Sequence, residues 1–123
     1  MWMDGLDVPL VEHLDAQFME KGSESMQAVN GSQGENFAQF GNTMKPVEYQ
    51  ARSKTSPLFW YPYDRTMEAL ESLAVNTEAH PCWGYKLQYT NPVTGGWAMP
   101  TMGTHMQMLP SSFSGRGYRS NAP

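Results

Sequence analysis

Apolar positions in the first part of the chain recur with helical spacing. Leu10, Leu14 and Phe18 lie four residues apart, so they fall on one face of a helix. Asp7 precedes this run as a residue that commonly caps a helix N-terminus, and Gly22 follows it as a typical C-terminal stop. The pattern therefore predicts a helix that begins after Asp7 and ends before Gly22.

A second helical pattern follows an extended aromatic segment. Residues 57–63, PLFWYPY, contain two prolines, which disfavour both a helix and a central strand. In residues 64–74, DRTMEALESLA, Asp64 stands at the N-cap position, and Met67 and Leu70 lie on one face. The sequence therefore predicts an irregular aromatic segment followed directly by a helix.

Strict alternation of apolar and polar side chains predicts two strands further along the chain. Residues 85–90 alternate in this way, and residues 102–109 place methionines on one side and His105 on the other. The segment between them, NPVTGG at 91–96, is rich in turn residues. We therefore expect two strands joined through a turn longer than a minimal hairpin.

The remaining segments carry little periodicity. Residues 22–41 are rich in Gly, Ser, Asn and Gln, which is typical of a linker or of a mobile excursion over a surface. Residues 1–6 are too short to stand as an independent element and resemble the end of a strand. Too few strands follow Pro110 to close a barrel. The predicted fold class is thus α+β, with helices, a linker and the opening strands of an incomplete β unit.

Composition narrows the class of function. A chain of 123 residues has room for one small domain at most, with a modest core. Its net charge of −4 and pI near 5.2 argue against nucleic acid as a partner. No apolar run approaches the roughly 20 residues of a membrane span, and no secretory signal is visible. The single cysteine, Cys82, excludes an internal disulfide and fits a cytoplasmic location.

Histidines give no complete metal site by spacing. A catalytic metal needs about three protein ligands that converge on one point. His13, His80 and His105 fall in a predicted helix, a loop and a strand, and none belongs to a His-x-His pair. The nearest approach to ligand spacing is His80 with Cys82. We expect an exposed helix residue at 13, an ordinary loop residue at 80 and a half-buried strand residue at 105.

The sequence also lacks a complete motif for nucleophilic catalysis or phosphate binding. Cys82 has no cationic neighbour closer than Lys86 in the sequence, so nothing there activates a thiolate. The glycine pair at 95–96 is not followed by the lysine of a phosphate-binding loop. The aromatic residues within 59–63 could form a stacking platform, but packing across a domain surface suits an acidic chain better. By residue chemistry alone, the chain carries no complete active site.

Three stretches together resemble one family, the gentisate 1,2-dioxygenases. MWMDGLDVPLVEHLDAQFME at 1–20 resembles the segment that closes the first cupin barrel and enters the linker helix. SPLFWYPYDRTMEALESL at 56–73 resembles the inter-barrel segment. YKLQYTNPVTGGWAMPTMGTHMQMLP at 85–110 resembles the entry into the second barrel, where Asn-Pro-x-Thr-Gly-Gly followed by Met-Pro-Thr is characteristic.

This resemblance implies a division of the chain into three parts. Residues 1–6 would end a first cupin barrel, a double-stranded β-helix of the jelly-roll type. Residues 7–84 would form the inter-barrel helices and linker, and residues 85–123 the incomplete start of a second cupin barrel. Members of the family use Fe(II) and O2 to open the ring of gentisate to maleylpyruvate in aromatic catabolism, and relatives act on salicylate and 1-hydroxy-2-naphthoate. They commonly form homotetramers.

The resemblance places the iron outside this chain. In the family, the three iron-binding histidines and the arginines that bind the substrate carboxylate lie in the first barrel, upstream of residue 1. Asp4 matches an acidic residue near the substrate pocket, and Trp2 matches the aromatic residue just before it. Tyr118, Arg119 and Ser120 fall where a metal-binding cupin would place His-x-His, so no metal is expected in the second barrel either.

Two hypotheses follow for the chain itself. The first is a piece of a gentisate 1,2-dioxygenase-like protein that is inactive alone, because the iron-binding histidines are missing. The second is a non-catalytic interaction module that pairs with another barrel-forming chain. For the full-length protein, the resemblance implies an aromatic hydroxy acid of the gentisate type as the ligand.

Overall fold

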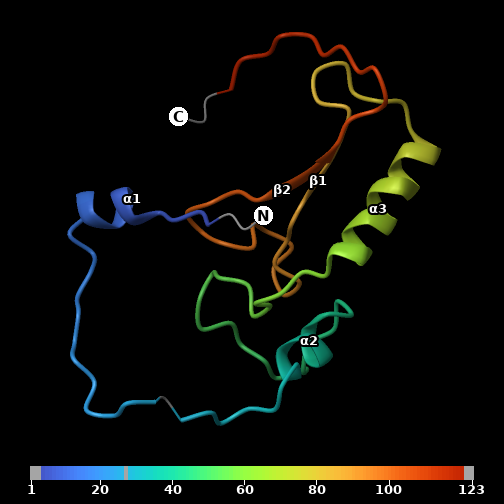
Figure 1. Ribbon diagram of the computed structural model, residues 1–123. Coiled ribbons are helices and arrows are strands. Elements are labelled where there is room, and N and C mark those ends of the chain that lie inside the picture. The colour runs from blue at the N-terminus through green and yellow to red at the C-terminus, as the bar shows by residue number, and fades with distance from the viewer. Residues whose placement is uncertain (1–3, 27, 121–123) are drawn as a thin grey trace. The chain divides into compact units, whose positions relative to one another are not determined.

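The chain divides into two compact units, Met1–Glu35 and Asn36–Pro123. The computed structural model describes residues 4–26 and 28–120. Five elements occur in the described residues (Figure 1): α1 (Val8–His13), α2 (Glu35–Phe40), α3 (Tyr63–Asn76), β1 (Tyr85–Gln88) and β2 (His105–Met108). Helices together with an antiparallel pair of strands confirm the predicted α+β class in its general form. In the described part of the chain, no helix is long and apolar enough to cross a membrane.

Helix α1 begins where the sequence predicts and ends earlier. Asp7 is its N-cap residue, and the Asp7 carbonyl accepts hydrogen bonds from the backbone N–H groups of Leu10 (3.0 Å) and Val11 (3.1 Å). The helix ends at His13, so the predicted extension toward Gly22 is wrong.

A backbone motif explains the early end of α1. Asp15 adopts the left-handed conformation with φ of 50°, which stops helical propagation. The Ala16 N–H then donates to the Val11 carbonyl (3.1 Å), and the Asp15 N–H donates to the Glu12 carbonyl (3.0 Å). These two bonds form a Schellman motif that satisfies the last carbonyls of the helix. Phe18, on the predicted apolar face, is 91% exposed.

Helix α2 lies within the segment predicted as a linker. The Ser32 N–H donates to Glu35 Oε2 (3.2 Å), in the manner of a capping box that holds the start of the helix. The Phe40 ring at its end is buried, and it packs edge-on against Tyr49 with a centroid distance of 5.1 Å. The linker prediction for residues 22–41 is therefore wrong at its C-terminal end.

Helix α3 begins earlier than predicted, because its N-cap lies two positions upstream. Pro62, rather than Asp64, is the N-cap residue. Its carbonyl accepts hydrogen bonds from both the backbone N–H (3.2 Å) and the hydroxyl (3.1 Å) of Thr66. Proline suits this position because a missing N–H costs nothing before the first turn. Leu70, in the middle of α3, has no exposed surface and is the centre of the small core.

The two strands form the antiparallel pair that alternation predicts. Tyr85 pairs with Met108, and Leu87 pairs with Met106, so these apolar side chains share one face. α3 packs against both strands (Figure 1), and the Tyr89 hydroxyl donates to Thr66 Oγ1 of α3 (3.2 Å), which fixes the side of the hairpin that the helix covers. The other face carries the polar residues Lys86, Gln88, His105 and Gln107.

Asn91 holds the turn between the strands in place. Its side chain is buried, its Oδ1 accepts a hydrogen bond from the Val93 N–H (2.9 Å), and its Nδ2 donates to the Lys54 carbonyl (3.2 Å). The backbone N–H of Gly95 closes the turn onto the Asn91 carbonyl (2.8 Å), and Gly95 has a φ of 72° that favours glycine. The predicted turn is confirmed, and Asn91 also anchors it to a segment far away in the sequence.

We expect Asn91→Ala to lower the free energy of unfolding by about 2 kcal/mol, because it removes a buried side chain and leaves the part-buried Val93 N–H and the Lys54 carbonyl without their partner. The matched control is Asn76→Ala, since the Asn76 amide bonds to the Ser72 carbonyl at an exposed site. Its cost should stay below about 0.5 kcal/mol. Urea denaturation followed by tryptophan fluorescence measures both, and equal losses would contradict the anchoring role of Asn91.

Candidate functional site

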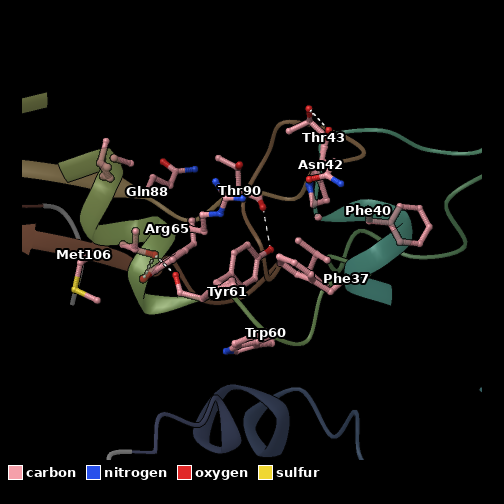
Figure 2. Close-up of a pocket in the computed structure, with 18 residues that line it drawn as sticks. Phe37, Phe40, Asn42, Thr43, Trp60, Tyr61, Arg65, Gln88, Thr90 and Met106 are labelled. Atoms are coloured by element: carbon pink, nitrogen blue, oxygen red, sulfur yellow. Dashed lines mark hydrogen bonds between the residues drawn. The ribbon is translucent and has the colours of Figure 1, made fainter. Parts of the chain in front are cut away.

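The second unit contains an open hollow of about 480 Å³. Four parts of this unit line it (Figure 2): α2 with the loop after it, the aromatic segment before α3, the first turns of α3, and the hairpin. The lining is mainly apolar and aromatic. Its largest side chains are Phe37, Phe40, Leu58, Trp60, Tyr61, Leu87, Tyr89 and Met106.

Tyr61, which lines the hollow, connects the aromatic segment to the hairpin. Its hydroxyl makes hydrogen bonds with Ser56 Oγ (2.7 Å) and with the Thr90 carbonyl (2.9 Å), the second of which is drawn in Figure 2. Its ring packs edge-on against Tyr89 at a centroid distance of 5.1 Å. Because the hydroxyl oxygen is engaged on both sides, Tyr61 offers mainly its ring to the hollow.

Ser56 continues this hydrogen-bond network beyond Tyr61. Its Oγ accepts a hydrogen bond from the Leu58 N–H (3.1 Å), and its backbone N–H donates to the Ala98 carbonyl (2.8 Å). Ser56 is buried, and no buried side-chain nitrogen or oxygen in the described residues lacks a hydrogen-bond partner. The polar side-chain atoms of Ser56 and Tyr61 are therefore already hydrogen-bonded. The polar side chains that line the hollow are those of Asn42, Thr43, Arg65, Thr66, Gln88 and Thr90.

The aromatic wall is formed by side chains that are distant in the sequence. Phe37 of α2 packs against Trp60 with a centroid distance of 5.5 Å and a tilt of 47° between the rings. Trp60 nevertheless remains 63% exposed, and its neighbour Phe59, which does not line the hollow, is 89% exposed. Of the aromatic run that the sequence singles out, Tyr61 packs inward while Phe59 and Trp60 offer large apolar surface.

Arg65 is the one charged residue that lines the hollow. Its Nη1 lies 3.5 Å from Glu68 Oε2 one turn further along α3, and both side chains are more than 70% exposed. An exposed pair of this kind contributes little to stability, but the neighbouring carboxylate reduces the attraction of Arg65 for an anionic ligand. The hollow is therefore weakly charged.

The two histidines of the second unit pack on different tryptophans. His80 stacks on Trp83 with a centroid distance of 3.4 Å, and its Nδ1 accepts a hydrogen bond from the Cys82 N–H (3.2 Å). His105 is edge-on to Trp97 at 5.3 Å. His105 lies on a strand as predicted but is exposed, so the half-buried prediction is wrong, because it falls on the polar face away from α3.

Metal-ligand geometry is not found among these groups. Residues 4–26 and 28–120 contain no cluster of three or more His, Cys, Asp or Glu side chains that could hold a metal ion. His13 is exposed at the end of α1 in the other unit, as predicted. The imidazoles of His80 and His105 pack against indole rings, so in this structure they contribute to side-chain packing.

The family resemblance places two residues, Asp4 and Trp2, near a substrate pocket. Trp2 lies outside the described residues. Asp4 is exposed in the stretch without regular structure before α1. Their role near a pocket stays a prediction.

Sequence reasoning missed the hollow itself, since its lining comes from four separate segments. A partial signal exists in the spacing of Phe37 and Phe40, which are three residues apart within an otherwise polar stretch. That spacing predicts a short amphipathic turn of helix. What the turn packs against cannot be read from the pattern.

No family model matches the chain. Among curated proteins, it is 42% identical over 120 residues to gentisate 1,2 dioxygenase 1 of Aquipseudomonas alcaligenes, a match that covers 98% of this chain and 35% of that protein. It is 31% identical to 1-hydroxy-2-naphthoate 1,2-dioxygenase of Nocardioides sp. (strain KP7), over 99% of this chain and 31% of the relative. Identity to 5-aminosalicylate 1,2-dioxygenase of Comamonas sp is 28%, over 89% of this chain and 29% of the relative. The chain thus spans about a third of the length of these relatives.

We expect Tyr61→Phe to lower the free energy of unfolding by about 1 kcal/mol, because the ring stays while the bonds to Ser56 and Thr90 are lost. Tyr63→Phe is the matched control, since Tyr63 is 62% exposed and starts α3 nearby. Urea denaturation midpoints compare the two. A Tyr63 variant that loses as much stability as the Tyr61 variant would show that the hydroxyl of Tyr61 has no special role.

Proposed function

The chain belongs to the gentisate 1,2-dioxygenase family, and on this premise we propose that it is part of an Fe(II)- and O2-dependent enzyme that opens the ring of a gentisate-like aromatic acid. The observation that carries the proposal is the 42% identity to the Aquipseudomonas alcaligenes protein along 98% of this chain. The named substrates of the relatives are all aromatic acids with an oxygen or nitrogen substituent on the ring. Gentisate, opened to maleylpyruvate, is the proposed substrate of the whole enzyme.

The proposal assigns this chain to the connection between two cupin barrels, together with the adjoining end of each barrel. Residues 1–6 end the first barrel, residues 7–84 connect the barrels, and residues 85–123 begin the second. The hairpin supports this assignment, because it has one apolar face under α3 and one polar face, as two strands of a larger sheet would have. Asp4 and Trp2 keep their proposed place near the substrate pocket.

The residues described here do not fit an iron centre by themselves. Iron in such an enzyme supplies the redox chemistry that joins O2 to the ring, and it needs several ligands at one point with open positions beside them. His80 and His105 are each stacked or packed on a different tryptophan. We therefore assign no step of the reaction to this chain, and propose that the iron ligands belong to the remaining two thirds of a full-length enzyme, which is cytoplasmic and homotetrameric.

A second candidate is an interaction module that pairs with another barrel-forming chain. The observation in its favour is the large apolar surface on the second unit, where Phe59, Trp60 and Tyr63 are all more than 60% exposed. Exposed apolar surface of this kind is typical of protein–protein contacts. The two candidates differ in whether the chain supports ring cleavage once it is joined to the rest of the enzyme.

A chimera distinguishes them. In the Aquipseudomonas alcaligenes relative, the stretch that matches this chain is replaced by residues 1–123. We expect the chimera to cleave gentisate with uptake of one O2 per gentisate, while the relative with the stretch deleted is inactive. A folded, iron-loaded chimera that leaves gentisate unchanged would contradict the proposed function.

The isolated chain provides the complementary measurement. With Fe(II), gentisate and air, we expect neither oxygen uptake nor maleylpyruvate from residues 1–123 alone, because no described cluster supplies the ligands. The intact relative serves as the positive control. Stoichiometric iron binding with turnover by the isolated chain would overturn the assignment of the ligands to other parts of the enzyme.

A further inference from the structure

The second unit buries few apolar side chains completely. Among the described residues, the buried hydrophobic side chains are Phe40, Leu70 and Ala98. Because burial contributes about 25 cal/mol per Å² of apolar surface, so small a core gives the unit little margin over the entropy of ordering its residues. Apolar contacts from outside the unit would therefore stabilise it.

The hollow is the place on the unit that is shaped to receive such contacts. Its aromatic wall of Phe37 and Trp60 remains open to solvent on one side, and Leu87 and Met106 of the hairpin continue the apolar lining. Figure 2 shows these aromatic side chains around Tyr61, between α2 and the first turn of α3. The surface is concave and formed by rigid rings, which is typical of the centre of a protein interface.

The chemistry of the hollow favours apolar side chains as its occupant over a small anionic acid. The Tyr61 hydroxyl is already engaged by Ser56 and Thr90. Arg65, the charged residue of the lining, is paired with Glu68. An anionic acid would therefore find one cationic partner, which it would share with Glu68, whereas apolar side chains would contact most of the lining.

We propose that the aromatic hollow is the docking surface for an apolar segment from the remaining two thirds of a gentisate 1,2-dioxygenase chain. This inference rests on the proposed function. In the relatives, about two thirds of each protein lies outside the stretch that matches this chain, so that stretch is covalently linked to further apolar segments there. Covalent linkage gives such a segment a high effective concentration, which favours it as the occupant over a second copy of this chain.

The test compares two neighbouring aromatic residues. Residues 1–123 are purified separately from the portions of the Aquipseudomonas alcaligenes relative that flank its matching stretch. Isothermal titration calorimetry then measures the affinity between the two. We expect Trp60→Ala to weaken binding by about tenfold or more, because Trp60 lines the hollow. Phe59→Ala is the matched control, since Phe59 is more exposed but lies outside the lining, and should change the affinity by less than about twofold.

Several outcomes would overturn the proposal. Equal weakening by both substitutions, or none by Trp60→Ala, would remove the hollow as the docking surface. A dimer of residues 1–123 that Trp60→Ala dissociates in size-exclusion chromatography would show that a second copy is the occupant. If the flanking portions are insoluble, the same pair is placed in the chimera, where Trp60→Ala should lower the Tm by about 2 °C or more and Phe59→Ala should not.

The result also separates this inference from the proposed function. If the chimera is active and Trp60→Ala and Phe59→Ala have the same effect, the proposed docking surface is wrong and the proposed function stands. If the chimera does not cleave gentisate but its stability depends on Trp60 and not on Phe59, the proposed function is wrong and the docking surface stands.

Discussion

The second unit depends on a hydrogen-bonded junction between two segments that are far apart in the sequence. Asn91 reaches the Lys54 carbonyl, Ser56 donates its N–H to Ala98, and Tyr61 bonds to the Thr90 carbonyl. These bonds hold the proline-containing aromatic segment against the turn between the strands, although neither segment has regular secondary structure. Because the polar groups are mutually satisfied, the backbone can be ordered there without a large core. α3 starts directly after this junction, so its direction over the hairpin is set by it.

The junction also decides which surface stays open. It engages the Tyr61 hydroxyl in hydrogen bonds, while the rings of Tyr61 and Trp60 line the hollow. A largely apolar hollow whose supporting hydrogen bonds are already formed can accept side chains without reorganising the backbone, which lowers the free-energy cost of binding. A segment of a larger enzyme would have this property if its core were completed by the rest of the chain.

The sequence predicts those features that depend on local periodicity. Alternation in residues 85–90 and 102–109 gives the hairpin and its faces, because a strand has a period of exactly two residues. The end of α1 was missed because Asp15 adopts the left-handed conformation, which the helical spacing of Phe18 conceals. α2 was missed because six residues in a polar segment are stabilised by the packing of Phe40 and not by propensity. The hollow could not be predicted at all, since it exists only where four segments meet.

Family membership and the scattered histidines are consistent once ligand geometry is considered. A metal site in a β-barrel is formed where several strands bring imidazoles to one point, so a part of such a barrel can retain the family sequence while contributing no ligand. In this chain the imidazoles of His80 and His105 pack on Trp83 and Trp97 instead, and the polar face of the hairpin remains exposed. Under the proposed function, this chain positions the elements that carry the ligands. Its contribution is then expected in the stability and assembly of the enzyme, and in the rate only through them.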